Sequence, residues 1–173
     1  EAHRAMGVTL FWLGEFAQAR DHLQQVHSLY DPTKHRDHAL RYGNDPGVAC
    51  LVHEAYVLWV LGYADQALAR SEEALALATR SNHPFSMAQA LLYRSFLHRH
   101  RREPEAAYRF AKETTTLAGQ EGFPFWLAES IIIQGWALVQ NGAATEAMAL
   151  IRNGLDDFLA TGAEMDRPRW LAT

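Results

Sequence analysis

The chain has 173 residues, of which 49% are apolar and 21% are charged. This balance is typical of a globular domain or a run of repeats and excludes a disordered tail. The net charge of −4 favours neither nucleic acid nor an anionic membrane as a partner. The longest nearly apolar run, 48–61, is too short to span a bilayer, and the single cysteine, Cys50, allows no internal disulfide. We therefore expect a cytoplasmic protein, and a piece of a longer one because the first residues already lie within an amphipathic pattern.

Prolines and glycines divide the chain into helices. All six prolines lie between stretches whose apolar residues recur at helical spacing. Proline is tolerated in the first helical turn and breaks the interior, so these residues mark helix starts and connectors. Gly14, Gly62 and Gly142 each end one helix and begin a short turn into the next. The predicted helices span 2–13, 15–30, 46–61, 63–80, 84–100, 104–120, 124–140 and 143–161, and a ninth begins near Pro168.

These helices form pairs, and the pairs recur about every 40 residues. Small residues show the period in the second helices and aromatic residues show it in the first. They are Ala67, Ala107 and Ala147, and Tyr56, Phe96 and Trp136. A fixed period of this kind is typical of stacked helix hairpins, because small side chains let two helix axes approach closely.

The first pair shows the family that this pattern resembles. Gly7, Gly14, Ala19, Leu23 and Val26 have the relative spacing of the core of a tetratricopeptide repeat (TPR), although the period is longer than the usual 34 residues. The resemblance implies an all-α, right-handed superhelical solenoid of about four TPR-like hairpins. We expect residues 1–173 to form a single helical-repeat domain.

A narrower resemblance rests on short stretches of sequence. They are Tyr30-Asp31-Pro32, His35-Arg36, Tyr42-Gly43, Asp45-Pro46-Gly47-Val48, Leu61-Gly62-Tyr63, His83-Pro84-Phe85, Gly122-Phe123-Pro124 and Gly135-Trp136-Ala137. Together they resemble the C-terminal repeat region of large bacterial signalling proteins that join an adenylate/guanylate cyclase domain to an AAA-type ATPase module. The resemblance implies a regulatory or scaffolding tail. The chain contains neither the cyclase carboxylates nor a phosphate-binding loop, so no catalytic residue is carried over.

The candidate chemical groups do not converge on a reaction. His35 and His38 are three residues apart, but zinc requires three or four converging ligands, so we predict no metal and no cofactor. The basic run 98–102 is followed at once by Glu103, as expected for favourable charge at a helix C-terminus.

The most apolar helix carries the remaining candidates. We expect Cys50 to be a small buried hydrophobe. His53 and Glu54 are either a base and an acid or, as we favour, one hydrogen-bonded within the stack and one in solvent. No catalytic motif is present, so we predict no enzyme in this chain.

The connector 31–45 makes the first step between pairs longer than the later ones. It is either a functional loop or, as we favour, a cover over the seam between the first two pairs, with Leu40 and Tyr42 tucked against it.

Projection of the template places an aromatic groove on the concave face. Its predicted residues are Phe11, Trp12, Val52, Tyr56, Trp59, Leu92, Phe96, Ile132 and Trp136, with Arg4, Gln89 and Glu129 among the few polar ones. Such a groove predicts a protein-interaction module that binds a peptide, a helix or a neighbouring domain. The alternatives are packing of each ring between adjacent first helices, and a small-molecule sensor that gates an attached cyclase or ATPase. The ninth helix is cut short, which predicts self-association through an exposed apolar seam.

Overall fold

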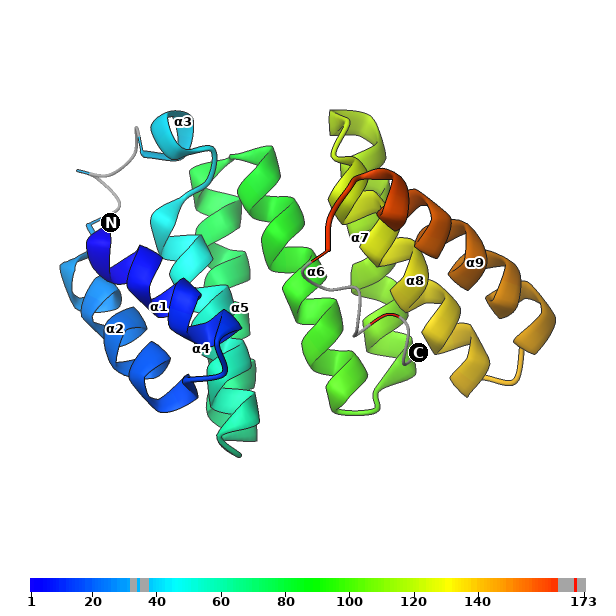
Figure 1. Ribbon diagram of the computed structural model, residues 1–173, viewed down its shortest axis with the longest axis horizontal. Coiled ribbons are helices and arrows are strands. Elements are labelled where there is room, and N and C mark those ends of the chain that lie inside the picture. Colours follow the sequence, from blue (N-terminus) through cyan, green and yellow to red (C-terminus); the bar gives the residue numbers. More distant parts are fainter. Residues whose placement is uncertain (32–33, 35–37, 165–169, 171–173) are drawn as a thin grey trace. The chain divides into compact units, whose positions relative to one another are not determined.

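A computed structural model describes residues 1–31, 34, 38–164 and 170, and all the regular elements in these residues are helices (Figure 1). They are α1 (Ala2–Trp12), α2 (Phe16–Leu29), α3 (His38–Tyr42), α4 (Pro46–Val60), α5 (Ala64–Ser81), α6 (Pro84–His100), α7 (Pro104–Glu121), α8 (Pro124–Gln140) and α9 (Ala144–Ala160). The all-α array of helix hairpins predicted from the sequence is confirmed. The short α3 was not predicted, and apart from Trp170 the predicted ninth helix near Pro168 lies outside the described residues. No helix in the described part of the chain is long and apolar enough to cross a membrane.

The chain divides into two compact units, unit 1 (Glu1–Tyr93) and unit 2 (Arg94–Thr173). Helix α6 runs through the boundary, so its residues up to Tyr93 belong to unit 1 and the rest to unit 2. In unit 1, α1 packs on α2, α2 on α4, and α4 on α5. In unit 2, α7 packs on α8 and α8 on α9. Within each unit, therefore, a first helix packs both on its own partner and on the second helix of the preceding pair.

The start of α4 shows why the sequence folds as it does locally. The Asp45 side chain accepts hydrogen bonds from the backbone N–H groups of Gly47 (2.8 Å) and Val48 (3.2 Å), and Pro46 lies in the first turn. This cap binds N–H groups that lack partners at a helix start. The Asp45 N–H in turn donates to Ser86 Oγ at 2.8 Å, which ties the cap to the first turn of α6.

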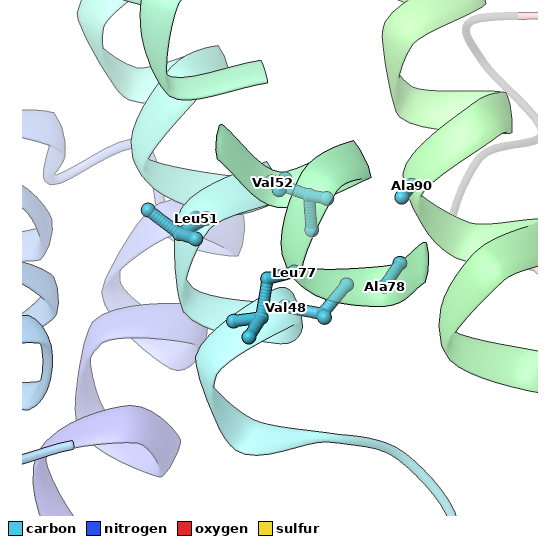
Figure 2. Packing of buried hydrophobic residues seen from close by; sticks show 7 residues of the cluster. Val48, Leu51, Val52, Leu77, Ala78 and Ala90 are labelled. Atoms are coloured by element: carbon cyan, nitrogen blue, oxygen red, sulfur yellow. The ribbon is translucent and has the colours of Figure 1, made fainter. Parts of the chain in front are cut away.

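Apolar side chains from three helices form a core cluster in unit 1 (Figure 2). Its labelled members are Val48, Leu51 and Val52 of α4, Leu77 and Ala78 of α5, and Ala90 of α6. Helix α4 is buried along nearly its whole length. It is the central helix of this unit, which explains why its sequence is apolar on all sides.

Small residues let the two helices of a hairpin approach closely. Ala67, Ala107 and Ala147 are fully buried, as their 40-residue spacing predicted. A Cβ added to Gly135 would lie 2.5 Å from Ile151 Cγ1 and 3.1 Å from the Ala147 carbonyl oxygen. The hairpin interior thus has no room for a larger side chain at this crossing.

The turn inside each hairpin requires a left-handed residue. Gly14, Gly62 and Gly142 have φ of 82°, 88° and 83°, and Arg102 has φ of 59° at the equivalent position of the third hairpin. Only glycine adopts this region without a steric cost, so Arg102 is the strained member of the set.

The connector before α4 does not behave as predicted. Leu40 is 82% exposed and Tyr42 is 46% exposed, so the expectation that they tuck against the seam is wrong. The described part of α3 buries Ala39 instead. The space beside Gly47 is already taken by Tyr30, whose ring would lie 2.7 Å from a Cβ at that glycine.

Candidate functional site

The nine residues of the predicted groove fall into two classes. Phe11, Val52, Leu92, Phe96 and Ile132 are buried. Trp12, Tyr56, Trp59 and Trp136 are half-buried. The first class packs into the units as core, so these five residues cannot contact a partner in this form of the protein. The second class consists entirely of Trp and Tyr, whose amphipathic rings suit a surface that is apolar and polar by turns.

In unit 1 the rings gather around Phe11. Its ring makes edge contacts with Trp12, His53 and Tyr56 at centroid distances of 5.0, 5.3 and 5.5 Å. Tyr93 extends the cluster, with its ring 5.2 Å from His53 and 6.5 Å from Tyr56. The half-buried rings are therefore held in place by core rings beneath them, which fixes their orientation before any partner arrives.

His53 is a buried, neutral component of this cluster. Its Nδ1 lies 2.6 Å from the Ala49 carbonyl oxygen, and its Nε2 lies 3.3 Å from the Tyr93 hydroxyl. Burial lowers the pKa of His53 to about 4, so the ring is neutral near pH 7. Since a carbonyl only accepts, Nδ1 carries the proton and Nε2 accepts from Tyr93. The expectation of a histidine hydrogen-bonded within the stack is confirmed.

Glu54 differs from its prediction, because it does not reach solvent. Its side chain is 2% exposed, and Arg70 Nε lies 3.3 Å from its Oε1. Arg70 also binds both carboxylate oxygens of Glu73, at 2.8 and 2.7 Å. Partial burial opposes the charge of Arg70, but Glu54 and Glu73 outweigh it and raise the pKa of the guanidinium. The buried carboxylate thus acquires a cation from the next helix, which the single-helix pattern could not reveal.

A cavity of about 300 Å³ lies among α2, α4 and α5 of unit 1. Cys50 and Leu77 belong to its apolar part, and His27, Glu73 and Arg80 supply polar groups. Burial raises the pKa of the Cys50 thiol to about 12, so no thiolate forms near pH 7. The prediction of Cys50 as a small buried hydrophobe is confirmed.

In unit 2 a pocket on the first helices holds Trp170, and we call it the Trp170 pocket. Its residues are Phe96 and Arg99 of α6 and Glu129 and Trp136 of α8. The indole Nε1 of Trp170 donates to Glu129 Oε1 at 3.0 Å, and its ring lies 5.7 Å from that of Phe96. The Arg99 guanidinium lies 5.5 Å from the Trp170 ring centroid and 5.9 Å from that of Trp136.

Sequence reasoning found only part of this pocket. It placed Phe96 and Trp136 in the groove and Glu129 among its few polar residues, but it missed Arg99 and Trp170. One signal for Trp170 exists, since it is a large aromatic residue in a stretch rich in charge, 164–169. Nothing in its spacing links it to Glu129, which lies 41 residues earlier.

The basic run after α6 is neutralised locally. Glu103 Oε2 lies 2.6 Å from His98 Nδ1, and its Oε1 accepts from Arg101 Nε at 2.9 Å. Burial lowers the pKa of His98, whose ring also stacks on Phe110 at 5.3 Å. The charges therefore serve the helix end, in agreement with the sequence-based interpretation. Within the described residues, no three His, Cys, Asp or Glu side chains are grouped so that they could hold a metal ion.

Comparison with known proteins identifies the fold and not the family. No protein-family profile matches the sequence, and no curated protein matches it. Among solved structures, the chain is similar to the apo form of RapI, with a TM-score of 0.76 and 11% sequence identity. The similarity covers 92% of this chain and 56% of the RapI chain, so the sequence spans little more than half the length of that protein. The match supports a helical-repeat array.

Proposed function

We propose that this chain is a non-catalytic interaction module in which the first helix of each hairpin binds a protein or peptide partner. The observation that carries the proposal is the half-burial of aromatic rings at the same repeat position of two first helices, Tyr56 on α4 and Trp136 on α8. Trp12 and Trp59 add similar rings in unit 1. Tyrosine and tryptophan on a rigid support dominate the energetics of many protein interfaces.

The context of the module is part of the proposal. The sequence resemblance suggests a bacterial signalling protein with a cyclase or ATPase domain elsewhere in its chain, and a cytoplasmic location. In that case the partner is a neighbouring domain of the same protein. The coding sequence upstream of Glu1 tests this context directly, since a start codon at that point would contradict it.

Affinity capture with matched variants tests the interaction itself. Wild-type protein, Tyr56→Ala and Trp136→Ala are immobilised, and the proteins they retain from the source cell are identified. The controls are Tyr63→Ala and Met148→Ala, which remove exposed apolar side chains outside the first helices. We expect the two ring variants to melt nearly normally and to lose a partner that both controls keep. Equal capture by all the folded variants would contradict the proposal.

The cavity among α2, α4 and α5 favours a second candidate, a small-molecule sensor. Its volume of about 300 Å³ and its mixture of apolar and polar groups are typical of a small ligand site. A thermal-shift screen against metabolites tests it, with Ala76→Phe as the variant that fills the cavity. A compound that raises the melting midpoint of the wild type but not of Ala76→Phe would favour the sensor over the scaffold.

A further inference from the structure

Trp170 is 1% exposed although it lies beyond the last hairpin of the array. We propose that the Trp170 pocket is a recognition site for a tryptophan side chain presented by a peptide segment, and that Trp170 occupies this site in cis. The inference rests on the proposed function and gives it a partner chemistry. The site would accept the same side chain from another protein or domain once Trp170 leaves.

The chemistry of Glu129 is the first reason. A carboxylate with 1% exposure on an apolar helix is costly unless a donor reaches it. Its Oε1 accepts from the indole N–H of Trp170, a group that only donates. This donor comes from a residue outside the four hairpins, so the repeat array carries a buried acceptor whose indole donor is supplied from elsewhere.

The surrounding side chains select for an indole. Phe96 contributes an aromatic wall, and the Arg99 guanidinium lies over the Trp170 ring at a distance suited to a cation–π contact. Tryptophan is the best cation–π acceptor among the aromatic residues and alone combines a large ring with an edge N–H. Phenylalanine would leave the Glu129 carboxylate without its indole partner.

Trp136 links the pocket to the surface proposed for binding. Arg99 lies over the rings of both Trp170 and Trp136, and Trp136 is half-buried. A partner that places tryptophan on Glu129 would therefore contact Trp136 through the same arginine. Attachment in cis gives Trp170 an effective concentration in the millimolar range, so it masks the site from weak ligands and yields to stronger or multivalent ones.

A peptide offered in trans tests the inference. A fluorescently labelled peptide of residues 164–173, Glu-Met-Asp-Arg-Pro-Arg-Trp-Leu-Ala-Thr, is titrated into full-length wild type and into full-length Trp170→Ala, and the anisotropy is followed. We expect saturable binding to Trp170→Ala and at least tenfold weaker binding to the wild type. Trp170→Phe guards against misfolding, because it keeps a ring in the pocket, and we expect binding between the two.

Matched changes on both molecules locate the contact. A peptide with naphthylalanine in place of tryptophan keeps the size of the ring but lacks the N–H, and it should bind about tenfold more weakly or worse. Arg99→Ala in the Trp170→Ala background should weaken binding by about two- to fivefold through loss of the cation–π contact. Arg152→Ala removes an exposed arginine from α9 and should change nothing.

The opposite results are equally clear. If folded Trp170→Ala and Trp170→Phe bind the peptide no better than the wild type, or bind the naphthylalanine peptide equally well, the inference is wrong. The proposed function would survive that result if partner capture still depended on Tyr56 in unit 1. If capture is independent of all the half-buried rings, the proposed function fails whatever the peptide does.

Discussion

The two units satisfy the polar groups buried on their first helices in different ways. In unit 1, His53 bonds to Ala49 and Tyr93, and Glu54 bonds to Arg70, so all the partners come from neighbouring repeat helices. In unit 2, Glu129 bonds to Trp170, which lies outside the repeat helices. The hairpins themselves follow one template in both units, with the same close crossing and the same left-handed turn.

This difference distinguishes structure from recognition within a single repeat pattern. A buried polar group whose partners belong to the same array is part of the stability of that array. A buried polar group whose partner comes from another segment marks a surface that the array has left open for an occupant. On this reasoning the ring cluster of unit 1 has a core part, around His53, and a half-exposed part, whereas in unit 2 the occupant is already present.

The largest expected effect separates core rings from surface rings. Phe96→Ala should lower the free energy of unfolding by about 3–5 kcal/mol, because Phe96 is 2% exposed. Tyr56→Ala and Trp136→Ala remove half-buried rings and should cost clearly less. Denaturant titration of the three variants measures the order. Unfolding of both Tyr56→Ala and Trp136→Ala would show that these rings are structural, and the proposed binding surface would lose its best residues.

Acid should weaken the protein through His53 of unit 1. Burial lowers the pKa of His53 from an ordinary value near 6.5 to about 4, so between these values the unfolded chain binds a proton that the folded chain excludes. Stability is therefore complete above pH 6.5 and decreases as the pH falls towards 4. The loss from this group between pH 7 and pH 5 should be about 2 kcal/mol.

A His53→Gln variant isolates that contribution. It removes the titrating ring, so the difference in unfolding free energy between pH 7 and pH 5 should shrink by most of that amount. The lowered pKa of His98 acts in the same direction from unit 2 and stays in place as an internal reference. An unchanged pH dependence in His53→Gln would mean that His53 does not stay neutral in the fold.

The close crossings provide a smaller and sharper comparison between the units. Gly135→Ala should destabilise by about 1–2 kcal/mol, because overpacking against Ile151 and the Ala147 carbonyl exceeds the gain in helix propensity. Gly7→Ala meets the movable end of Leu23 at 2.9 Å and should cost less. Gly119→Ala has open space around it and should be neutral or stabilising. Equal melting midpoints for all three would show that crossing distance does not limit these hairpins.

The elements that the sequence predicted best are those with local signals. Helix starts at Pro46, Pro84, Pro104 and Pro124 agree with the structure to the residue, because proline acts within one helical turn. The helix hairpins followed from small residues at a fixed period, since their effect on axis distance is the same in each repeat. The fold class was therefore available without any tertiary information.

The site was only partly predictable, because it depends on contacts between segments distant in sequence. The template correctly placed Glu129 on the groove face, but the residue that binds it comes from 41 positions away with no periodic signal. Exposure was the second weakness. Template position alone could not tell that Leu92 and Ile132 are fully buried while Trp136 is half-buried, since burial depends on what the adjacent helices leave uncovered.

The smallest expected effect concerns the one turn that departs from the template. Arg102 has φ of 59° where the other three turns have glycine, and a side chain with a Cβ is disfavoured in this region. Arg102→Gly should therefore stabilise the protein by about 0.5 kcal/mol, the strain relieved minus the extra entropy of glycine in the unfolded chain. Arg102→Ala separates this backbone effect from loss of the arginine side chain, and Gly142→Arg makes the reverse change in the same unit. If Arg102→Gly lowers the melting midpoint while Gly142→Arg leaves it unchanged, the four turns are not equivalent and the repeat equivalence on which the comparison of units rests must be redrawn at the third hairpin.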